Sequence, residues 1–172
     1  MLASVFQVMV MKLLNAAVGL FLLLGPTSAE AGWNRFVSDY SGCSIAYPSS
    51  VFTPNAKFDS DGGTRFTSSL PSARLVVAGG ANLKRSSVAD IVQNYLDAAQ
   101  GETITYRRKE KRWAVYSGYQ NDLIYYLKVV LSNDGRRACI LELKYPISAK
   151  LHFDPIVVRT AGSLRLSSSI AE

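Results

Sequence analysis

The sequence predicts an α+β domain in which an antiparallel sheet of about six or seven strands packs with two helices. Three observations lead to this prediction. Short segments that alternate between apolar and polar residues occur before and after one strongly amphipathic segment. Several alternating segments follow one another with only short turns between them, as in an antiparallel meander. A further helical segment lies near the C-terminal end.

The first half of the domain is predicted to contain three strands. Residues 42–47 alternate and stop at Pro48, and residues 64–68 and 73–78 form a pair joined around Pro71. Residues 33–39 are expected to be an entry segment before the first strand. Residues 49–63 are expected to form a long loop, because they contain a proline and the turn sequence Asp-Gly-Gly.

The clearest helix is predicted over residues 86–99. Its apolar side chains recur at the spacing of one helical face: Val88, Ile91, Val92, Tyr95, Leu96 and Ala99. Ser87 is expected to cap the start, with Asp90 in the first turn. Gly101 is expected to adopt the left-handed conformation just past the end.

Further strands are predicted over residues 103–107, 113–117, 123–131 and 137–145. Asn133-Asp134-Gly135 predicts a hairpin turn, because asparagine and glycine tolerate a positive φ. The second helix is expected to begin with Asp154 as its N-cap and Pro155 in its first turn.

The N-terminal residues have the pattern of a secretory signal. Lys12 is followed by an apolar run over residues 13–24 and then by the small residues of Ala29-Glu30-Ala31. The apolar run is 12 residues long, shorter than the roughly 20 that span a membrane. We therefore expect a cleaved signal peptide, residues 1–31, and one mature domain, residues 32–172, with an uncleaved anchor as the alternative. Met1, Met9 and Met11 are alternative starts.

The chain has two cysteines and a formal net charge of +6, which bear on a possible disulfide and on the charge of its partners. Cys43 and Cys139 each lie on the apolar face of a predicted strand, so export to an oxidising compartment would allow a disulfide between them. Two buried, unbridged thiols are the alternative. The basic excess favours anionic partners in general and identifies none.

Several segments together resemble a known fold. The strand GCSIAYP, the helix after a short strand pair, the meander and the segment FDPIVVRTAGSL resemble the PsbP-like fold of extrinsic photosystem subunits and Mog-type Ran-binding proteins. The chain also resembles small exported uncharacterised proteins of alphaproteobacteria. The resemblance covers the whole expected mature chain and implies a non-catalytic scaffold that binds a partner. It identifies no functional residue here.

No grouping of residues indicates catalysis, a metal or a cofactor. The only histidine, His152, would need a thiol or hydroxyl partner to act in catalysis, and we expect it at the surface. One histidine and no C-x-x-C pair disfavour a zinc site. We therefore expect no catalytic residue, no metal ligand and no cofactor, and keep an unidentified enzyme as the least favoured alternative.

The densest charged segment is a candidate anion site. It contains five cations in six positions: Arg107, Arg108, Lys109, Lys111 and Arg112. These could bind phosphate groups, and in an exported protein a phosphorylated envelope lipid is a better candidate than nucleic acid. The alternative is a solvated hairpin tip, where charges prevent edge-to-edge pairing of sheets.

Four tyrosines around the meander are a candidate interface: Tyr116, Tyr119, Tyr125 and Tyr126. Tyrosine is enriched at protein interfaces, although it also suits half-buried strands. The sequence thus predicts an exported, non-catalytic binding module, in the periplasm or outside the cell. Its expected partner is a protein or envelope component, with anion binding as the alternative function and no membrane span after cleavage.

Overall fold

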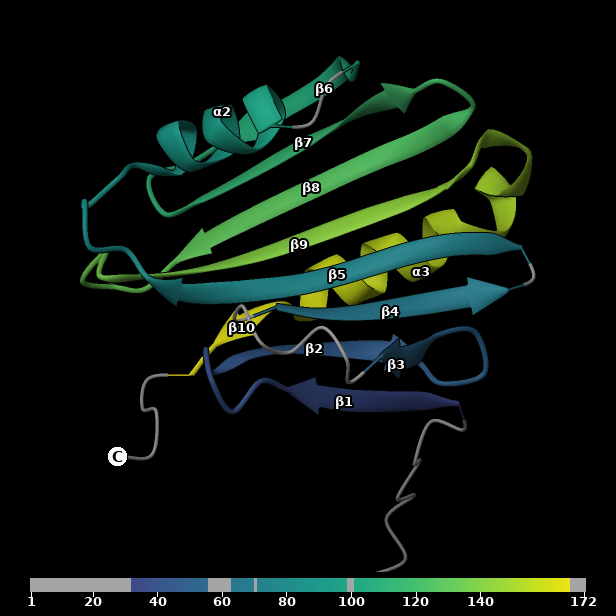
Figure 1. Cartoon of the computed structure of the whole chain (residues 1–172), viewed down its shortest axis with the longest axis horizontal. Coiled ribbons are helices and arrows are strands. Elements are labelled where there is room, and N and C mark those ends of the chain that lie inside the picture. Colours follow the sequence, from purple (N-terminus) through teal and green to yellow (C-terminus); the bar gives the residue numbers. More distant parts are fainter. Residues whose placement is uncertain (1–31, 56–62, 70, 99–100, 168–172) are drawn as a thin grey trace, which may run out of the picture. The chain divides into compact units, whose positions relative to one another are not determined.

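The structure, a computed structural model, describes residues 32–55, 63–69, 71–98 and 101–167 (Figure 1). All of them belong to the unit Gly32–Glu172. The expected signal peptide, residues 1–31, lies outside the described residues. Within the described ranges, every helix is too short or too polar to cross a membrane.

The largest element is a seven-stranded sheet with the order β3-β4-β5-β9-β8-β7-β6. All neighbouring strands are antiparallel. From one edge to the other, the strands are β3 Thr53–Asn55, β4 Gly63–Ser69, β5 Ser72–Ala81, β9 Arg137–Pro146, β8 Leu123–Leu131, β7 Trp113–Gln120 and β6 Thr103–Lys109. Together with two helices, this sheet confirms the predicted α+β class.

A second, three-stranded sheet was not predicted. It consists of β1 Trp33–Val37, β2 Cys43–Pro48 and β10 Arg165–Leu166, in the order β1-β2-β10. Strand β1 thus occupies most of residues 33–39, which were expected to be an entry segment and not a strand. It forms because it pairs along the whole of β2, which places Phe36 opposite Ile45. The short β10 pairs with the other edge of β2, beside Cys43.

The first helix, α2, spans Val88–Ala98, close to the predicted range. Its start is capped reciprocally: the Asp90 amide donates to Ser87 Oγ at 3.3 Å, and the Ser87 amide donates to the Asp90 carboxylate at 2.9 Å. Gly101 has a φ of +92°, the positive value expected just past the helix.

The second helix, α3, spans Lys150–Ser163 and follows a 3₁₀ turn over Ile147–Ala149. The prediction that it begins at Asp154 was wrong, because the chain turns into the helix directly after β9. Pro155 lies inside the helix and cannot donate to the carbonyl of Leu151. Leu151 is 94% exposed, so water can bond that carbonyl instead. Asp154 pairs with Lys150 and accepts a hydrogen bond from the Tyr145 hydroxyl at 3.1 Å.

Strand alternation gives the large sheet two different faces, which we call the α2 side and the α3 side (Figure 1). On the α3 side, helix α3 and the small sheet cover a core that includes Ile45, Leu75, Leu141 and Phe153. On the α2 side, helix α2 covers a smaller core that includes Val92, Leu127 and Val129. Adjacent residues of β8 therefore belong to different cores.

The two edges of the large sheet are interrupted. β3 is three residues long and has Pro54 at its centre. β6 is exposed along most of its length and has an irregular register between Ile104 and Tyr106. The close approach at this irregularity requires Gly118 on β7, since a Cβ there would lie 1.9 Å from the carbonyl oxygen of Thr103.

Candidate functional site

A disulfide joins the small sheet to the large one on the α3 side. Cys43 of β2 and Cys139 of β9 are bonded, with Cα atoms 5.7 Å apart. Both cysteines are fully buried. The strand beside them has to come close, because a Cβ on Gly79 would lie 2.2 Å from Cys43 Sγ and 2.7 Å from the Ala138 carbonyl oxygen.

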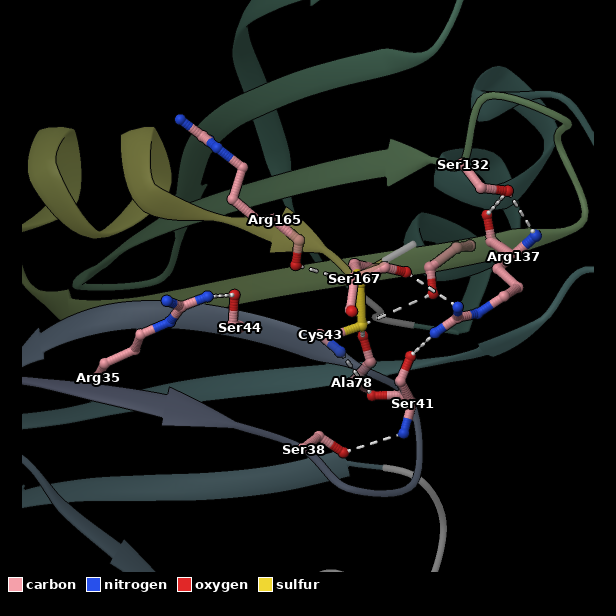
Figure 2. Close-up of a disulfide and its surroundings, with 12 residues drawn as sticks. Arg35, Ser38, Ser41, Cys43, Ser44, Ala78, Ser132, Arg137, Arg165 and Ser167 are labelled. Carbon is pink, nitrogen blue, oxygen red and sulfur yellow. Dashed lines mark hydrogen bonds between the residues drawn. A yellow bond between two sulfur atoms is a disulfide. The ribbon is translucent and has the colours of Figure 1, made fainter. Parts of the chain in front are cut away.

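Arg137 holds three segments together next to this disulfide (Figure 2). From β9, its guanidinium donates to the carbonyl of Ser41 in the β1–β2 turn and to the carbonyl of Ser167, at 3.0 Å, after β10. The Nε atom of Arg137 is buried and has no hydrogen-bond partner among the described residues.

The five cations predicted as one anion site lie on different surfaces of the β6–β7 hairpin. Arg107 and Lys109 pair with Tyr116 and Ala114, which face the α2 side. Arg108 faces the α3 side, where its guanidinium lies 5.1 Å from the Trp113 ring, and it is 3.7 Å from Glu110. Because alternate strand residues point in opposite directions, the three cations of β6 do not share one face, and Lys111 and Arg112 lie in the bend before β7.

A different group of cations meets where β7 begins and β8 ends, on the α3 side. These cations line a cleft of about 560 Å³ between the large sheet and the segment after α3. They come from four separate parts of the chain: Arg112, Lys128, Arg137 and Arg165. The cleft also contains Trp113, the apolar side chains of Val130, Leu131, Leu164 and Leu166, and one acidic residue, Asp134. We call this the cationic cleft.

Three of the four cations of the cleft, Lys128, Arg137 and Arg165, contact carbonyl oxygens. Lys128 Nζ donates to the carbonyl of Ala161 at 2.6 Å, and Arg165 donates to those of Gly162 and Leu164 at 2.8 and 2.9 Å. These carbonyls belong to the C-terminal turn of α3, which carries partial negative charge. Burial, followed by the charge of Arg165, lowers the pKa of Lys128. No ion pair joins a carboxylate to any of the four cations within the described ranges.

Of these four residues, the sequence prediction included only Arg112. Lys128 gave a signal, because it is a charged residue on the otherwise apolar face of Ile124, Tyr126 and Val130. Nothing in the local sequence indicated Arg137 or Arg165, since they reach the cleft through the pairing of distant strands.

The four candidate tyrosines are also divided between the two faces. Tyr116 and Tyr125 face α2, and Tyr125 is fully buried, so its inclusion in a surface interface was wrong. Burial, and then the charge of Glu142, raises the pKa of Tyr125. Tyr119 and Tyr126 face the α3 side. Burial, together with Tyr106, raises the pKa of Tyr126 to about 12.

Tyr119 and Tyr126 line a pocket of about 290 Å³ between α3 and strands β6 to β8. Tyr106 completes its aromatic wall, and Val157 and Val158 of α3 form the opposite side. Large apolar side chains are exposed around it: Tyr106 is 50% exposed, Tyr119 42% and Val158 74%. We call this the tyrosine pocket.

His152 is exposed on α3, with its ring 4.9 Å from that of Phe153 and edge-on to it. Both cysteine sulfurs are in the disulfide, so neither is available as a thiol partner for His152. No group of three or more potential metal ligands lies among the residues that the structure describes.

The α2 side holds charged residues of another kind. Lys144 Nζ lies 3.3 Å from Glu102, 2.8 Å from the Gln120 side-chain oxygen and 4.9 Å from the centre of the Tyr125 ring. The side chains of Lys144 and Glu102 are only 12% and 2% exposed. Arg74 pairs with the nearly buried Glu142 on the same face. Lys144 and the more exposed Arg74 therefore each have a carboxylate partner.

Comparison with known proteins identifies the fold. No protein-family model and no curated protein sequence matches the chain. The solution structure of cyanobacterial PsbP (CyanoP) from Synechocystis sp. PCC 6803 is similar, with a TM-score of 0.55 and 15% identity over 87% of this chain and 99% of that chain. The Saccharomyces cerevisiae Ran-binding protein Mog1p has a TM-score of 0.54 and 6% identity, over 78% of this chain and 95% of that chain. At these identities the likeness concerns the fold alone, and it confirms that this chain has a PsbP-like fold.

Proposed function

We propose that this chain is an exported, non-catalytic binding module, and that its partner is a protein that docks over the tyrosine pocket. The observation that carries the proposal is the gathering of exposed Tyr106, Tyr119 and Val158 around one hollow. Tyrosine offers a large apolar ring and a polar hydroxyl, which suits a surface that alternates between water and a partner.

A protein of similar fold supports the choice of a protein as partner. Mog1p, whose fold is similar, is a Ran-binding protein. That likeness does not transfer the partner, but it is consistent with a scaffold that presents a sheet face and a helix to another protein.

Export is supported by two independent features. The N-terminal residues have the basic start, apolar run and small-residue site of a secretory signal. The buried disulfide between Cys43 and Cys139 suits an oxidising compartment. The N-terminal sequence of the purified chain, together with cell fractionation, tests this part; the full-length precursor found only in the cytoplasm would contradict it.

Photocross-linking in living cells tests the docking surface. A benzoylphenylalanine at position 119 or 158 is expected to capture one discrete protein. The same group at Gln93, on the exposed face of α2, serves as the matched control and is expected to capture nothing. Equal capture from all three positions, or capture only from position 93, would contradict the proposed surface.

A further inference from the structure

We infer that the cationic cleft is a binding site for a phosphate-bearing amphiphile, whose phosphate lies among Arg112, Lys128 and Arg165 while its apolar part lies on Trp113 and the adjacent aliphatic side chains. This site is separate from the tyrosine pocket. The pocket is lined by Ser117, Tyr119, Ile124 and Tyr126, whereas the cleft lies at the other end of the same two strands.

The charge in the cleft is not balanced by the protein. Four cations line it against one acidic residue, Asp134, which also lies 3.9 Å from Arg136, a cation outside the cleft lining. Its carboxylate accepts hydrogen bonds from the Ser132 hydroxyl at 2.6 Å and the Arg136 amide at 3.0 Å, which lower the pKa of Asp134. A bound dianion would offset the repulsion between Lys128 and Arg165, and this favours phosphate over a singly charged group.

The donors are arranged for an anion. The ammonium of Lys128 has three N–H groups, of which the Ala161 carbonyl takes one. Arginine guanidinium groups bind phosphate oxygens through paired N–H donors. Arg112 is exposed beside Trp113 at the rim of the cleft, where its guanidinium is accessible to a ligand.

The size and lining of the cleft indicate that the ligand is more than a phosphate ion. A volume of about 560 Å³ is within the range of sites for small organic ligands. Val130 and Leu166, which are partly exposed, supply an apolar surface next to the cations, beside the buried Leu164. A ligand with a charged head and a short apolar chain uses both parts of the lining.

Binding of octyl phosphate below its micelle concentration tests this inference. The reporter is the indole N–H signal of Trp113, which is one of only two tryptophans in the chain. The Trp113 signal is expected to shift on titration while that of Trp33 stays in place. Octyl phosphate is expected to bind at least about tenfold more tightly than inorganic phosphate, because its chain is removed from water. It is also expected to bind more tightly than octanoate. Equal affinity for octanoate would overturn the phosphate assignment, and equal affinity for inorganic phosphate would overturn the apolar part.

Charge variants separate the cleft from general attraction to a basic protein. Arg165→Gln and Lys128→Gln are each expected to weaken binding by about tenfold or more. Lys109→Gln removes the same charge on the α2 side and is expected to leave binding unchanged. If Lys128→Gln does not fold, because α3 loses a contact, Arg112→Gln at the exposed rim replaces it. Similar weakening by Lys109→Gln and Arg165→Gln would overturn the site.

Two further arms distinguish the source of the phosphate and the role of the tyrosine pocket. Phosphatidylcholine vesicles with phosphatidic acid should recruit the wild-type chain and not Arg165→Gln if the ligand is a lipid. Recruitment that fails while octyl phosphate binds assigns the cleft to a soluble phosphorylated amphiphile. Tyr119→Ala is expected to abolish capture of the protein partner without changing octyl phosphate affinity, so the two proposals fail independently.

Discussion

On the α2 side of the large sheet Lys144 and Arg74 are paired with carboxylates, whereas on the α3 side Lys128 and Arg165 contact carbonyl oxygens. Lys144 and Arg74 each meet a glutamate, and these pairs are complete without a ligand. Lys128 and Arg165 meet only the partial charges at the end of α3. The cations on the α2 side are therefore neutralised by carboxylates of the protein, whereas those on the α3 side can still bind an anionic ligand.

The largest effect is expected from breaking a pair on the α2 side. Lys144→Met leaves the Glu102 carboxylate buried without its cation, which should lower the free energy of unfolding by about 3–5 kcal/mol. Chemical denaturation measures this. The double variant Glu102→Gln/Lys144→Met should recover much of the loss, because it leaves no uncompensated charge. A single variant as stable as wild type would show that the pair is not desolvated.

The covalent link between the sheets distinguishes the α3 side further. Cys43→Ser/Cys139→Ser is expected to lower the free energy of unfolding by about 2–4 kcal/mol, because the bond closes a loop between residues 96 positions apart. Reduction of the wild-type chain should give a similar loss, measured by thermal unfolding with and without reductant. No change on reduction would mean that the bond is not formed.

Two adjacent glycines of β5 test the spacing on each face. Gly79→Ala places a methyl group against Cys43 and the Ala138 carbonyl, so it should cost about 1–3 kcal/mol. Gly80→Ala points into open space on the other face and should stay within about 0.5 kcal/mol of wild type. Equal effects in denaturant titrations would contradict the close contact between β2 and β5.

Alkaline pH is expected to destabilise both faces. Burial raises the pKa of Tyr125 on the α2 side and of Tyr126 and Tyr145 on the α3 side. Above about pH 10, the unfolded chain loses tyrosine protons that the folded chain keeps. Stability should therefore be complete below about pH 10 and fall as the pH rises further. These three tyrosines should contribute to tyrosinate absorbance only once the protein unfolds, which an alkaline titration followed by absorbance measures.

The smallest effect is expected from single hydroxyl groups. Tyr145→Phe removes the hydrogen bond to Asp154 and should cost about 1 kcal/mol. Tyr125→Phe removes a buried hydroxyl that has no partner among the described residues, so it should be neutral or slightly stabilising. Urea titrations of the two variants that give the same loss would contradict this difference between the faces.

The elements that could be predicted from the sequence are those specified by local patterns. The alternation of β8, the capping residues of α2 and the turn at Gly135 are all visible within a few neighbouring residues. β1 and β10 could not be predicted, because they are strands only through pairing with β2. The start of α3 was misplaced because Pro155 is tolerated at an exposed position inside the helix.

The candidate sites were harder to predict because they, too, depend on which distant strands lie side by side. The segment from Arg107 to Arg112 is dense in charge along the chain, but strand geometry directs the cations of its β6 part to both faces. The cationic cleft has the opposite property: Lys128, Arg137 and Arg165 are far apart in the sequence and meet only in the fold. A strand lysine among apolar neighbours, such as Lys128, is the signal that sequence reasoning can use.

The interrupted edges of the large sheet affect whether two molecules can join their sheets edge to edge. A β-sheet border with unsatisfied amides can recruit a foreign strand and seed fibrils. Here one border is a three-residue strand centred on Pro54, and the other carries Arg107, Arg108 and Lys109 on an irregular strand. Both borders thus disfavour the pairing of an incoming strand, so the width of the sheet does not by itself create a template for fibrils.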